Sequence, residues 1–136
     1  MKEYKHVVQY YETDKMGITH HSNYIRWMEE ARVDYLEQIG WGYAHLESAG
    51  IISPVTGVEC SYKKTTTFAD EVYISLSIAE YNGVKLVFKY TMKNKNGEVV
   101  AEAKSSHCFL NSNGQFVFIN KFNPELHQTL KDLIAQ

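Results

Sequence analysis

The chain has 136 residues, of which 44% are hydrophobic and 22% charged, with a net charge of −2 at pH 7. This length fits one folded domain, residues 1–136, with a single core. The near-neutral charge gives no basic field of the kind that binds nucleic acid or an acidic membrane surface. The N-terminus has no apolar signal region and no run is long enough for a membrane span, so we expect a cytoplasmic protein. Cys60 and Cys108 form no CxxC pair, and we expect them to be reduced core residues.

The first third of the chain predicts a strand, a polar loop and one long helix. Residues 3–11 alternate apolar and polar side chains, which is typical of a short strand. We expect Ser22 to cap the helix and Gly40 to end it. Its apolar face follows the three-and-four spacing of an α-helix, with Tyr24, Ile25, Met28, Ala31, Tyr35, Leu36 and Ile39. Its solvent face carries pairs at the spacing of helical ion pairs, Arg26–Glu30 and Glu29–Arg32.

The rest of the chain is dominated by strand patterns. A weaker helical piece at residues 43–48 is followed by Pro54, which resists both a helix and a central strand. Asn82-Gly83 has the composition of a two-residue hairpin turn. A short helix is expected at residues 124–135. Alternating or β-branched segments predict strands at residues 55–67, 71–81, 85–93, 98–111 and, less regularly, 115–119.

One long helix among several antiparallel strands indicates an α+β fold, because a parallel sheet would need more crossover helices. The simplest packing lays the helix across one face of a curved antiparallel sheet, which buries its apolar stripe. Such a two-layer domain leaves a sheet edge open, and dimerisation is a natural way to cover it.

The polar loop before the long helix is the best place for chemistry. Asp14 lies a few residues ahead of His20 and His21, close to a helix N-terminus that can stabilise developing negative charge. Asp14 suits a nucleophile or general base, although from spacing alone an aspartate that organises the turn before Gly17 is the more common case. We expect the adjacent histidine side chains to diverge. Together with His45 and the His107-Cys108 pair they match no metal-ligand spacing, so we expect no metal site.

Other charged residues have weaker claims. Glu12 is a possible acid partner for Asp14, and Ser22 has no visible relay that would make it a nucleophile. Lys63, Lys64 and Lys85 could meet phosphate groups of a ligand, but solvated strand edges explain them equally well.

The region around Asp14 resembles the sequence pattern of the hotdog-fold acyl-CoA thioesterases. It is most similar to the 4-hydroxybenzoyl-CoA thioesterase branch, including the bacterial thioesterases associated with the Tol-Pal system. Such a string over about twenty positions is more specific than a single short motif. The residues that carry the resemblance are Tyr10-Tyr11-Glu12-Thr13-Asp14, Gly17, His21, Tyr24 and Glu29-Glu30-Ala31-Arg32.

The resemblance implies a hotdog fold and assigns roles to particular residues. Asp14 aligns with the catalytic carboxylate, and His21 with the position whose backbone N–H polarises the thioester oxygen. Gly17 permits close approach of the loop, and Tyr24 falls among the substrate-binding positions. Glu12 stands where many relatives have aspartate, at a position with no expected chemistry. The basic cluster that holds the CoA phosphates in the 4-hydroxybenzoyl enzyme is reduced here to Lys85.

The expected activity is hydrolysis of acyl-CoA thioesters to free acid and CoA, with CoA present only as part of the substrate and no other cofactor. The resemblance also implies a homodimer or homotetramer with an active site between subunits. Two alternatives remain on the same scaffold: a non-catalytic module that binds acyl-CoA, and a dehydratase acting on a 3-hydroxyacyl thioester.

Overall fold

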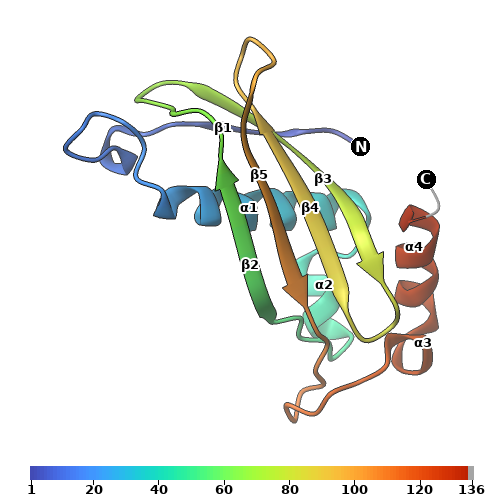
Figure 1. Cartoon of the computed structure of the whole chain (residues 1–136). Coiled ribbons are helices and arrows are strands. Elements are labelled where there is room, and N and C mark those ends of the chain that lie inside the picture. Colours follow the sequence, from blue (N-terminus) through green and yellow to red (C-terminus); the bar gives the residue numbers. More distant parts are fainter. Residues whose placement is uncertain (135–136) are drawn as a thin grey trace.

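A computed structural model describes residues 1–134 and shows a long helix lying across one face of a five-stranded antiparallel sheet (Figure 1). The sheet has the strand order β1-β3-β4-β5-β2. The strands are β1 (Tyr4–Val7), β2 (Val55–Tyr62), β3 (Glu71–Tyr81), β4 (Leu86–Lys93) and β5 (Val99–His107). The helices are α1 (Ser22–Gln38), α2 (Tyr43–Ser48), α3 (Ile119–Phe122) and α4 (Pro124–Ile134), with a short 3-10 turn η1 (Tyr10–Glu12) before α1. The expected α+β architecture is confirmed.

Helix α1 buries a narrower stripe than the sequence pattern suggests. Its buried side chains are Tyr24, Trp27, Met28, Ala31 and Tyr35. The expected place of Ile25 in this stripe is wrong, because its side chain is 37% exposed whereas Trp27 is fully buried. The expected ion pairs Arg26–Glu30 and Glu29–Arg32 do not form among the described residues. Glu30 instead accepts hydrogen bonds from partners on β1.

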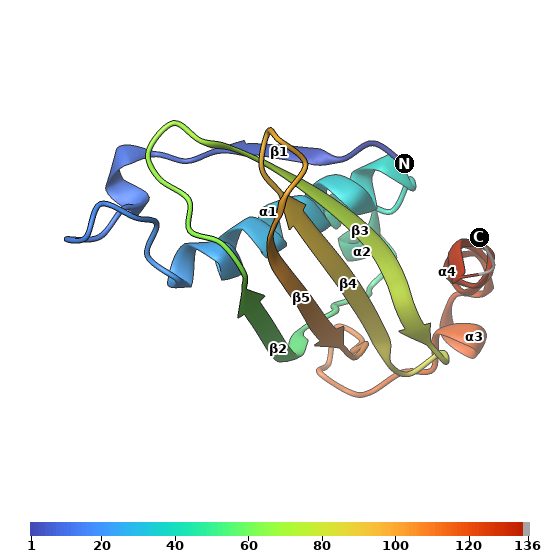
Figure 2. The ribbon, with the colours of Figure 1, turned by 45° about the horizontal axis from the view of Figure 1, so that its top comes forward.

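The inner face of the sheet supplies the other half of the core. Antiparallel pairing places Ile74 opposite Met92, and Tyr90 opposite Ala103, so alternate residues of β3, β4 and β5 face α1. The alternation along β4 places Leu86, Phe88, Tyr90 and Met92 on one face, and all four side chains are buried. Figure 2 shows these strands crossing α1, with α3 and α4 packed beside β3.

Several expected elements differ from the structure: the strands expected at residues 3–11, 55–67 and 98–111 are shorter and span Tyr4–Val7, Val55–Tyr62 and Val99–His107. The reversal between β3 and β4 takes four residues, 82–85, rather than two, because the strands end at Tyr81 and Leu86. Residues 115–119 form no strand: they make only an isolated bridge, Leu110 with Phe116, and then enter α3. The terminal helix α4 ends at Ile134 in the structure, and Ala135 of the expected helix lies outside the described residues. Both cysteines are free, and both are half-buried rather than core residues.

Strand β2 forms one edge of the sheet and pairs only with β5. Seven of its eight residues are exposed, and Val58 is 44% exposed. A long, open, partly apolar edge of this kind is a template for pairing with another strand. Within residues 1–134, no helix is long and apolar enough to cross a membrane.

Candidate active site

The loop that precedes α1 is folded into a closed turn around Asp14. A bridge between Thr13 and Thr19 closes the loop, and the backbone N–H of Asp14 donates to the carbonyl of Ile18 at 2.8 Å. Gly17 has φ of +82°, a conformation that side chains disfavour, and its N–H donates to the Asp14 carbonyl. The turn therefore requires glycine at position 17 for its backbone shape.

The half-buried carboxylate of Asp14 serves the turn with one oxygen and leaves the other free. Oδ1 accepts a hydrogen bond from the Met16 backbone N–H at 2.8 Å. No donor among the described residues reaches Oδ2. The structure therefore fits both roles that the sequence suggests for Asp14. One carboxylate oxygen organises the turn, and the other is available to a substrate or a water molecule.

The connection between β2 and β3 clamps this loop from the side. The Thr67 hydroxyl donates to the Gly17 carbonyl at 2.7 Å, and the Thr19 N–H donates to the Thr66 carbonyl at 2.9 Å. The hydroxyls of Thr19 and Thr66 are 2.6 Å apart, and the Tyr24 hydroxyl is 3.0 Å from the Thr66 hydroxyl. Since all these groups are partnered, the turn is held in one position relative to α1.

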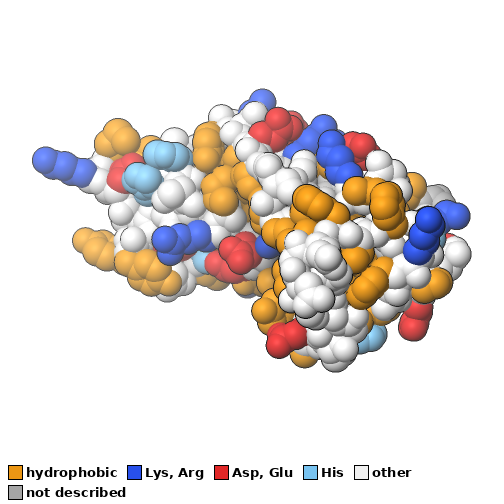
Figure 3. Space-filling view, turned by 90° about the horizontal axis from the view of Figure 1, so that it is seen from below, with side chains coloured by type: hydrophobic (Ala, Val, Ile, Leu, Met, Phe, Trp, Pro, Cys, Tyr) orange, Lys and Arg blue, Asp and Glu red, His pale blue; other side chains and the backbone are white. Residues whose placement is uncertain are grey.

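The start of α1 differs from the sequence expectation at two points. Ser22 is the first helical residue and His21 occupies the N-cap position, while the ring of His20, one residue earlier, accepts from the Ser22 N–H through Nδ1 at 3.2 Å. The rings of His20 and His21 do not diverge but stack, with centroids 4.3 Å apart. Both are exposed, and Figure 3 shows histidine side chains on the lobe that the loop before α1 forms.

The backbone of His21 presents a free donor at the helix start. Its carbonyl accepts from the Tyr62 hydroxyl at 3.1 Å, which ties the helix start to the edge strand β2. Its N–H finds no acceptor among the described residues, whereas the N–H groups of Ser22, Asn23 and Tyr24 all do. A free N–H next to the positive end of a helix is the type of group that stabilises an oxyanion.

An open depression of about 320 Å³ lies beside this helix start. Its walls include His21, Tyr24, Tyr62 and Lys63. Tyr24 contributes only its ring, because its hydroxyl is committed to Thr66 and the side chain is 3% exposed. Burial raises the pKa of Tyr24, so its hydroxyl stays neutral and cannot act as a base near neutral pH. Asp14 does not line this depression in the single chain, although its loop neighbours Ile18 and Thr19 do.

Glu12 anchors the Asp14 loop, a structural role that the sequence analysis missed. Its side chain is 5% exposed and accepts three hydrogen bonds at 2.8 Å, from the Gln9 N–H, His6 Nε2 and the Trp27 indole N–H. Burial opposes ionisation of Glu12, but these hydrogen bonds outweigh it and lower the pKa of the carboxyl. The Glu12 carbonyl also accepts from the His20 N–H at 2.8 Å, so one residue fixes both ends of the Asp14 loop.

The Glu12 network continues to β1 and to the solvent face of α1. His6 Nδ1 lies 3.1 Å from Glu30 Oε1, and the Tyr4 hydroxyl donates to the same oxygen at 2.8 Å. Burial and the neighbouring Glu30 carboxylate raise the pKa of Tyr4 to about 12. The sequence did carry a signal for this role of Glu12. Glu12 follows Gln9, the cap of the 3-10 turn, by three residues, and at this spacing a carboxylate reaches back to the free N–H of the cap.

The three lysines that could meet phosphate groups of a ligand do not form one cluster in the structure. Lys85 lies in the turn between β3 and β4, at the opposite end of the sheet from the Asp14 loop, with its Nζ 3.9 Å from Glu80 (Figure 1). One chain therefore does not bring Lys85 to Asp14. Lys63 and Lys64 both line the depression beside His21, and Lys64 also pairs with Glu98. Across residues 1–134, no group of three or more His, Cys, Asp or Glu side chains is placed to hold a metal ion.

The chain is similar in sequence to known thioesterases. Residues 8–130 match the family model of the thioesterase-like superfamily. YneP of Bacillus subtilis, named provisionally as an acyl-CoA thioesterase, is 36% identical over 121 residues, which cover 88% of each chain. A 1,4-dihydroxy-2-naphthoyl-CoA hydrolase of Thermosynechococcus vestitus is 26% identical over 111 residues, 81% of this chain and 76% of the relative.

A solved structure shows the same architecture. The DHNA-CoA thioesterase of Staphylococcus aureus superposes with a TM-score of 0.92 at 30% identity, covering 98% of this chain and 91% of that one. The family match spans nearly all of the chain, and the arrangement of one helix on a five-stranded antiparallel sheet is that of the hotdog thioesterases. The chain therefore belongs to the thioesterase-like superfamily, as an enzyme of the thioesterase class with the hotdog fold.

Proposed function

We propose that this protein hydrolyses acyl-CoA thioesters to free acid and CoA, with Asp14 as the catalytic carboxylate. The observation that carries the proposal is the presence of two unpartnered groups, one in the Asp14 loop and one at the helix start that directly follows it. Asp14 keeps a free carboxylate oxygen, and His21 keeps a free backbone N–H. A nucleophile or base and an oxyanion donor are the two groups that acyl transfer requires.

The chemistry needs no further group from the protein. Asp14 either attacks the thioester carbonyl or removes a proton from an attacking water, and the carbonyl oxygen gains negative charge that the His21 N–H stabilises. Collapse of this intermediate breaks the carbon–sulfur bond, and the thiolate of CoA leaves and takes up a proton. If Asp14 attacks directly, water then hydrolyses the mixed anhydride and restores the carboxylate. A thioester is reactive enough for this pair of groups to suffice.

A second copy of the chain completes the site in this proposal. The edge strand β2 runs from Val55 to Tyr62, and Tyr62 binds the His21 carbonyl. Antiparallel pairing of two such strands about their centre sets the Tyr62 end of one copy against the Val55 end of the other. Each Asp14 loop would then lie beside residues 52–54 of a second copy. We expect a homodimer, or a tetramer built from it.

Residues near the depression are candidates for holding CoA. Lys63 stands beside His21 and can meet a phosphate or the pantetheine arm. Gly17 keeps the loop narrow enough for close approach, and the Tyr24 ring forms a wall. Lys85 can contribute only from another copy, because it lies at the far end of its own sheet.

The test is release of free thiol from short, long and aromatic acyl-CoAs, with the acid product identified by mass spectrometry. Equal amounts of thiol and acid would support the proposal. Loss of water from a 3-hydroxyacyl-CoA without thiol release would instead indicate a dehydratase. Tight binding of CoA esters with no product at all would indicate a binding module and overturn the proposal.

A further inference from the structure

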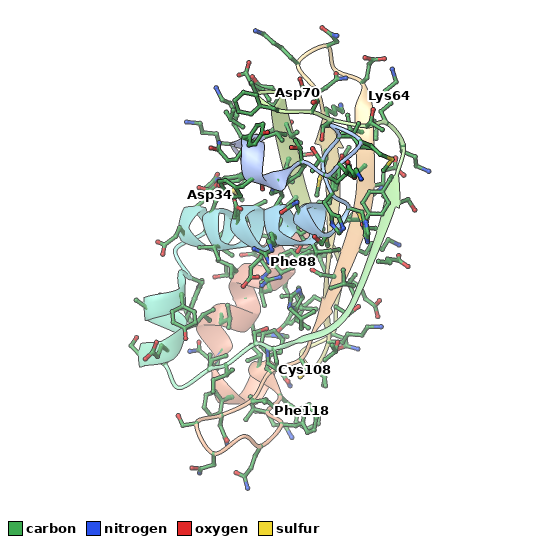
Figure 4. All side chains as sticks on the ribbon, turned by 90° about the vertical axis from the view of Figure 1, so that its left-hand side faces the viewer. Asp34, Lys64, Asp70, Phe88, Cys108 and Phe118 are labelled. Atoms are coloured by element: carbon green, nitrogen blue, oxygen red, sulfur yellow. The ribbon has the colours of Figure 1, made fainter. Side chains whose placement is uncertain are left out.

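A second pocket lies on the other side of α1 from the Asp14 loop. It encloses about 290 Å³ between the second half of α1, α2, strands β4 and β5, and α4. This volume is close to the lower end of the roughly 300–1,000 Å³ typical of ligand pockets. Figure 4 shows Phe88 between α1 and the strands, on the opposite side of the helix from Lys64 and Asp70. Most of the wall is apolar and includes Leu36, Leu46, Phe88, Phe109, Leu126 and Leu130.

Among these apolar side chains stands a buried histidine. His107 is 1% exposed, and its Nε2 lies 2.7 Å from the Ser105 hydroxyl, which in turn lies 2.6 Å from the hydroxyl of fully buried Tyr90. Burial, together with the nearby Arg32 guanidinium, lowers the pKa of His107 to about 4, so the ring is neutral near pH 7. The neutral ring has one N–H, and its neighbours decide which nitrogen carries it.

The hydrogen-bond chain fixes this choice. Arg32 can only donate, and its guanidinium lies beside the Tyr90 hydroxyl. The Tyr90 proton therefore goes to Ser105, and the Ser105 proton goes to Nε2 of His107, because in the reverse direction the fully buried Tyr90 O–H would have no acceptor among the described residues. Nδ1 of His107 must then carry the ring proton.

The Nδ1–H faces the pocket. No described residue accepts from it, yet no fully enclosed side-chain nitrogen or oxygen among residues 1–134 lacks a hydrogen-bond partner. Nδ1 is therefore open to the space that His107 lines. Arg32 lines the same space and pairs with no described carboxylate, whereas the acids of the lining, Glu29 and Glu47, are exposed.

We propose that this pocket receives the acyl group of the substrate and selects acyl groups that carry an acceptor oxygen far from the thioester. The apolar wall fits a compact hydrocarbon body, while the His107 N–H and the Arg32 guanidinium bind a phenolic, keto or carboxylate oxygen. A plain hydrocarbon would leave the buried N–H without a partner. The inference rests on the proposed hydrolysis and on the proposed dimer, in which residues 52–54 of the pocket lining lie beside the Asp14 loop of a second copy.

Matched pairs of substrates test this selectivity. We would compare phenylacetyl-CoA with 4-hydroxyphenylacetyl-CoA, and hexanoyl-CoA with the mono-CoA ester of adipic acid, measuring kcat/KM by thiol release. The wild-type protein should favour the oxygen-bearing member of at least one pair by about tenfold or more. In His107→Phe the ratio for the phenolic pair should fall to about one, because an aromatic ring remains but the N–H donor is gone, whereas Arg32 should retain part of the preference for the carboxylate.

Two further variants guard against a folding artefact. Arg32→Gln removes the cation from the half-buried face of α1 and should reduce the preference mainly for the carboxylate substrate. Lys104→Gln removes one positive charge from the exposed outer face of β5 and should leave both ratios unchanged.

If wild type hydrolyses both members of every pair equally, the inference is wrong while the hydrolase assignment stands. If no acyl-CoA releases thiol, the assignment itself is wrong and the inference falls with it.

Discussion

Replacement of Glu12 by glutamine is the most informative change outside the reacting groups. Three donors, the Gln9 N–H, His6 Nε2 and the Trp27 indole N–H, converge on the Glu12 carboxylate at 2.8 Å. Hydrogen bonds to a charged group contribute about 1.5–3 kcal/mol each, and a buried donor without a partner costs about 1–3 kcal/mol. Glutamine offers one oxygen and one NH₂ group, so at least one donor must lose its acceptor. We expect Glu12→Gln to destabilise the fold by about 2–4 kcal/mol.

The assay is denaturant unfolding with thermal unfolding beside it, and the expected loss in Tm is on the order of 10 °C. Glu30→Gln is the matched control, because Glu30 also contacts His6 but its side chain is 40% exposed. It should cost less than about 1 kcal/mol. Glu12→Gln should also lower kcat at a temperature where the variant is folded, by about tenfold or more, since the Asp14 loop loses its anchor. Wild-type stability and turnover in Glu12→Gln would refute this account of the loop.

The remaining predictions concern pH, backbone shape and assembly. His107 has a pKa lowered to about 4 against an ordinary value near 6.5, so the unfolded chain binds a proton first as pH falls. Stability should therefore be full above about pH 6.5 and decline towards pH 4 by up to about 3 kcal/mol, and His107→Gln should flatten this decline in unfolding titrations. Gly17→Ala should cost about 1 kcal/mol and lower turnover because Gly17 has φ of +82°, whereas Gly57→Ala, at a glycine without that strain, should be near neutral in both assays. Val58→Lys should shift the protein towards monomer in sedimentation measurements and reduce turnover, because it replaces an apolar side chain of the edge strand with a charged one that opposes strand pairing; unchanged mass would exclude β2 as the contact.

The fold could be predicted from local patterns because its elements have clear periods. The three-and-four spacing identified α1, and the alternation of apolar and polar residues identified β3 and β4. The sequence pattern placed Ile25 on the buried face in place of Trp27. Both residues flank the same apolar stripe, and only their packing partners decide which of the two is buried. Trp27 has a buried acceptor, Glu12 on the preceding turn, which no local pattern reveals.

The helical ion pairs failed for a similar reason. Glu30 stands at the right spacing from Arg26, but it is held by Tyr4 and His6 from β1, which are remote in sequence. Residues 115–119 have strand composition, yet they follow a tight turn in which the Asn111 N–H donates to the Gln115 carbonyl, and they continue into α3 before a ladder can form.

The candidate site could be located but not fully specified. The sequence marked Asp14, Gly17 and His21, and the structure places them on one clamped loop. It could not mark His107 as a recognition group, because its significance depends on Ser105, Tyr90 and Arg32, which meet only in the folded chain. It also could not show that Lys85 lies at the far end of the sheet, since that depends on topology.

The most direct test of the central claim compares Asp14→Asn with Asp70→Asn in the thiol-release assay. Both aspartates lie at neighbouring turns and accept a hydrogen bond from a backbone N–H, Met16 for Asp14 and Thr67 for Asp70. Asparagine can preserve either bond through its own oxygen, so both variants should fold like wild type. We predict that Asp14→Asn lowers kcat by about a hundredfold or more, while Asp70→Asn stays within a few-fold of wild type. Near-normal turnover in folded Asp14→Asn would contradict the assignment of Asp14 as the catalytic carboxylate.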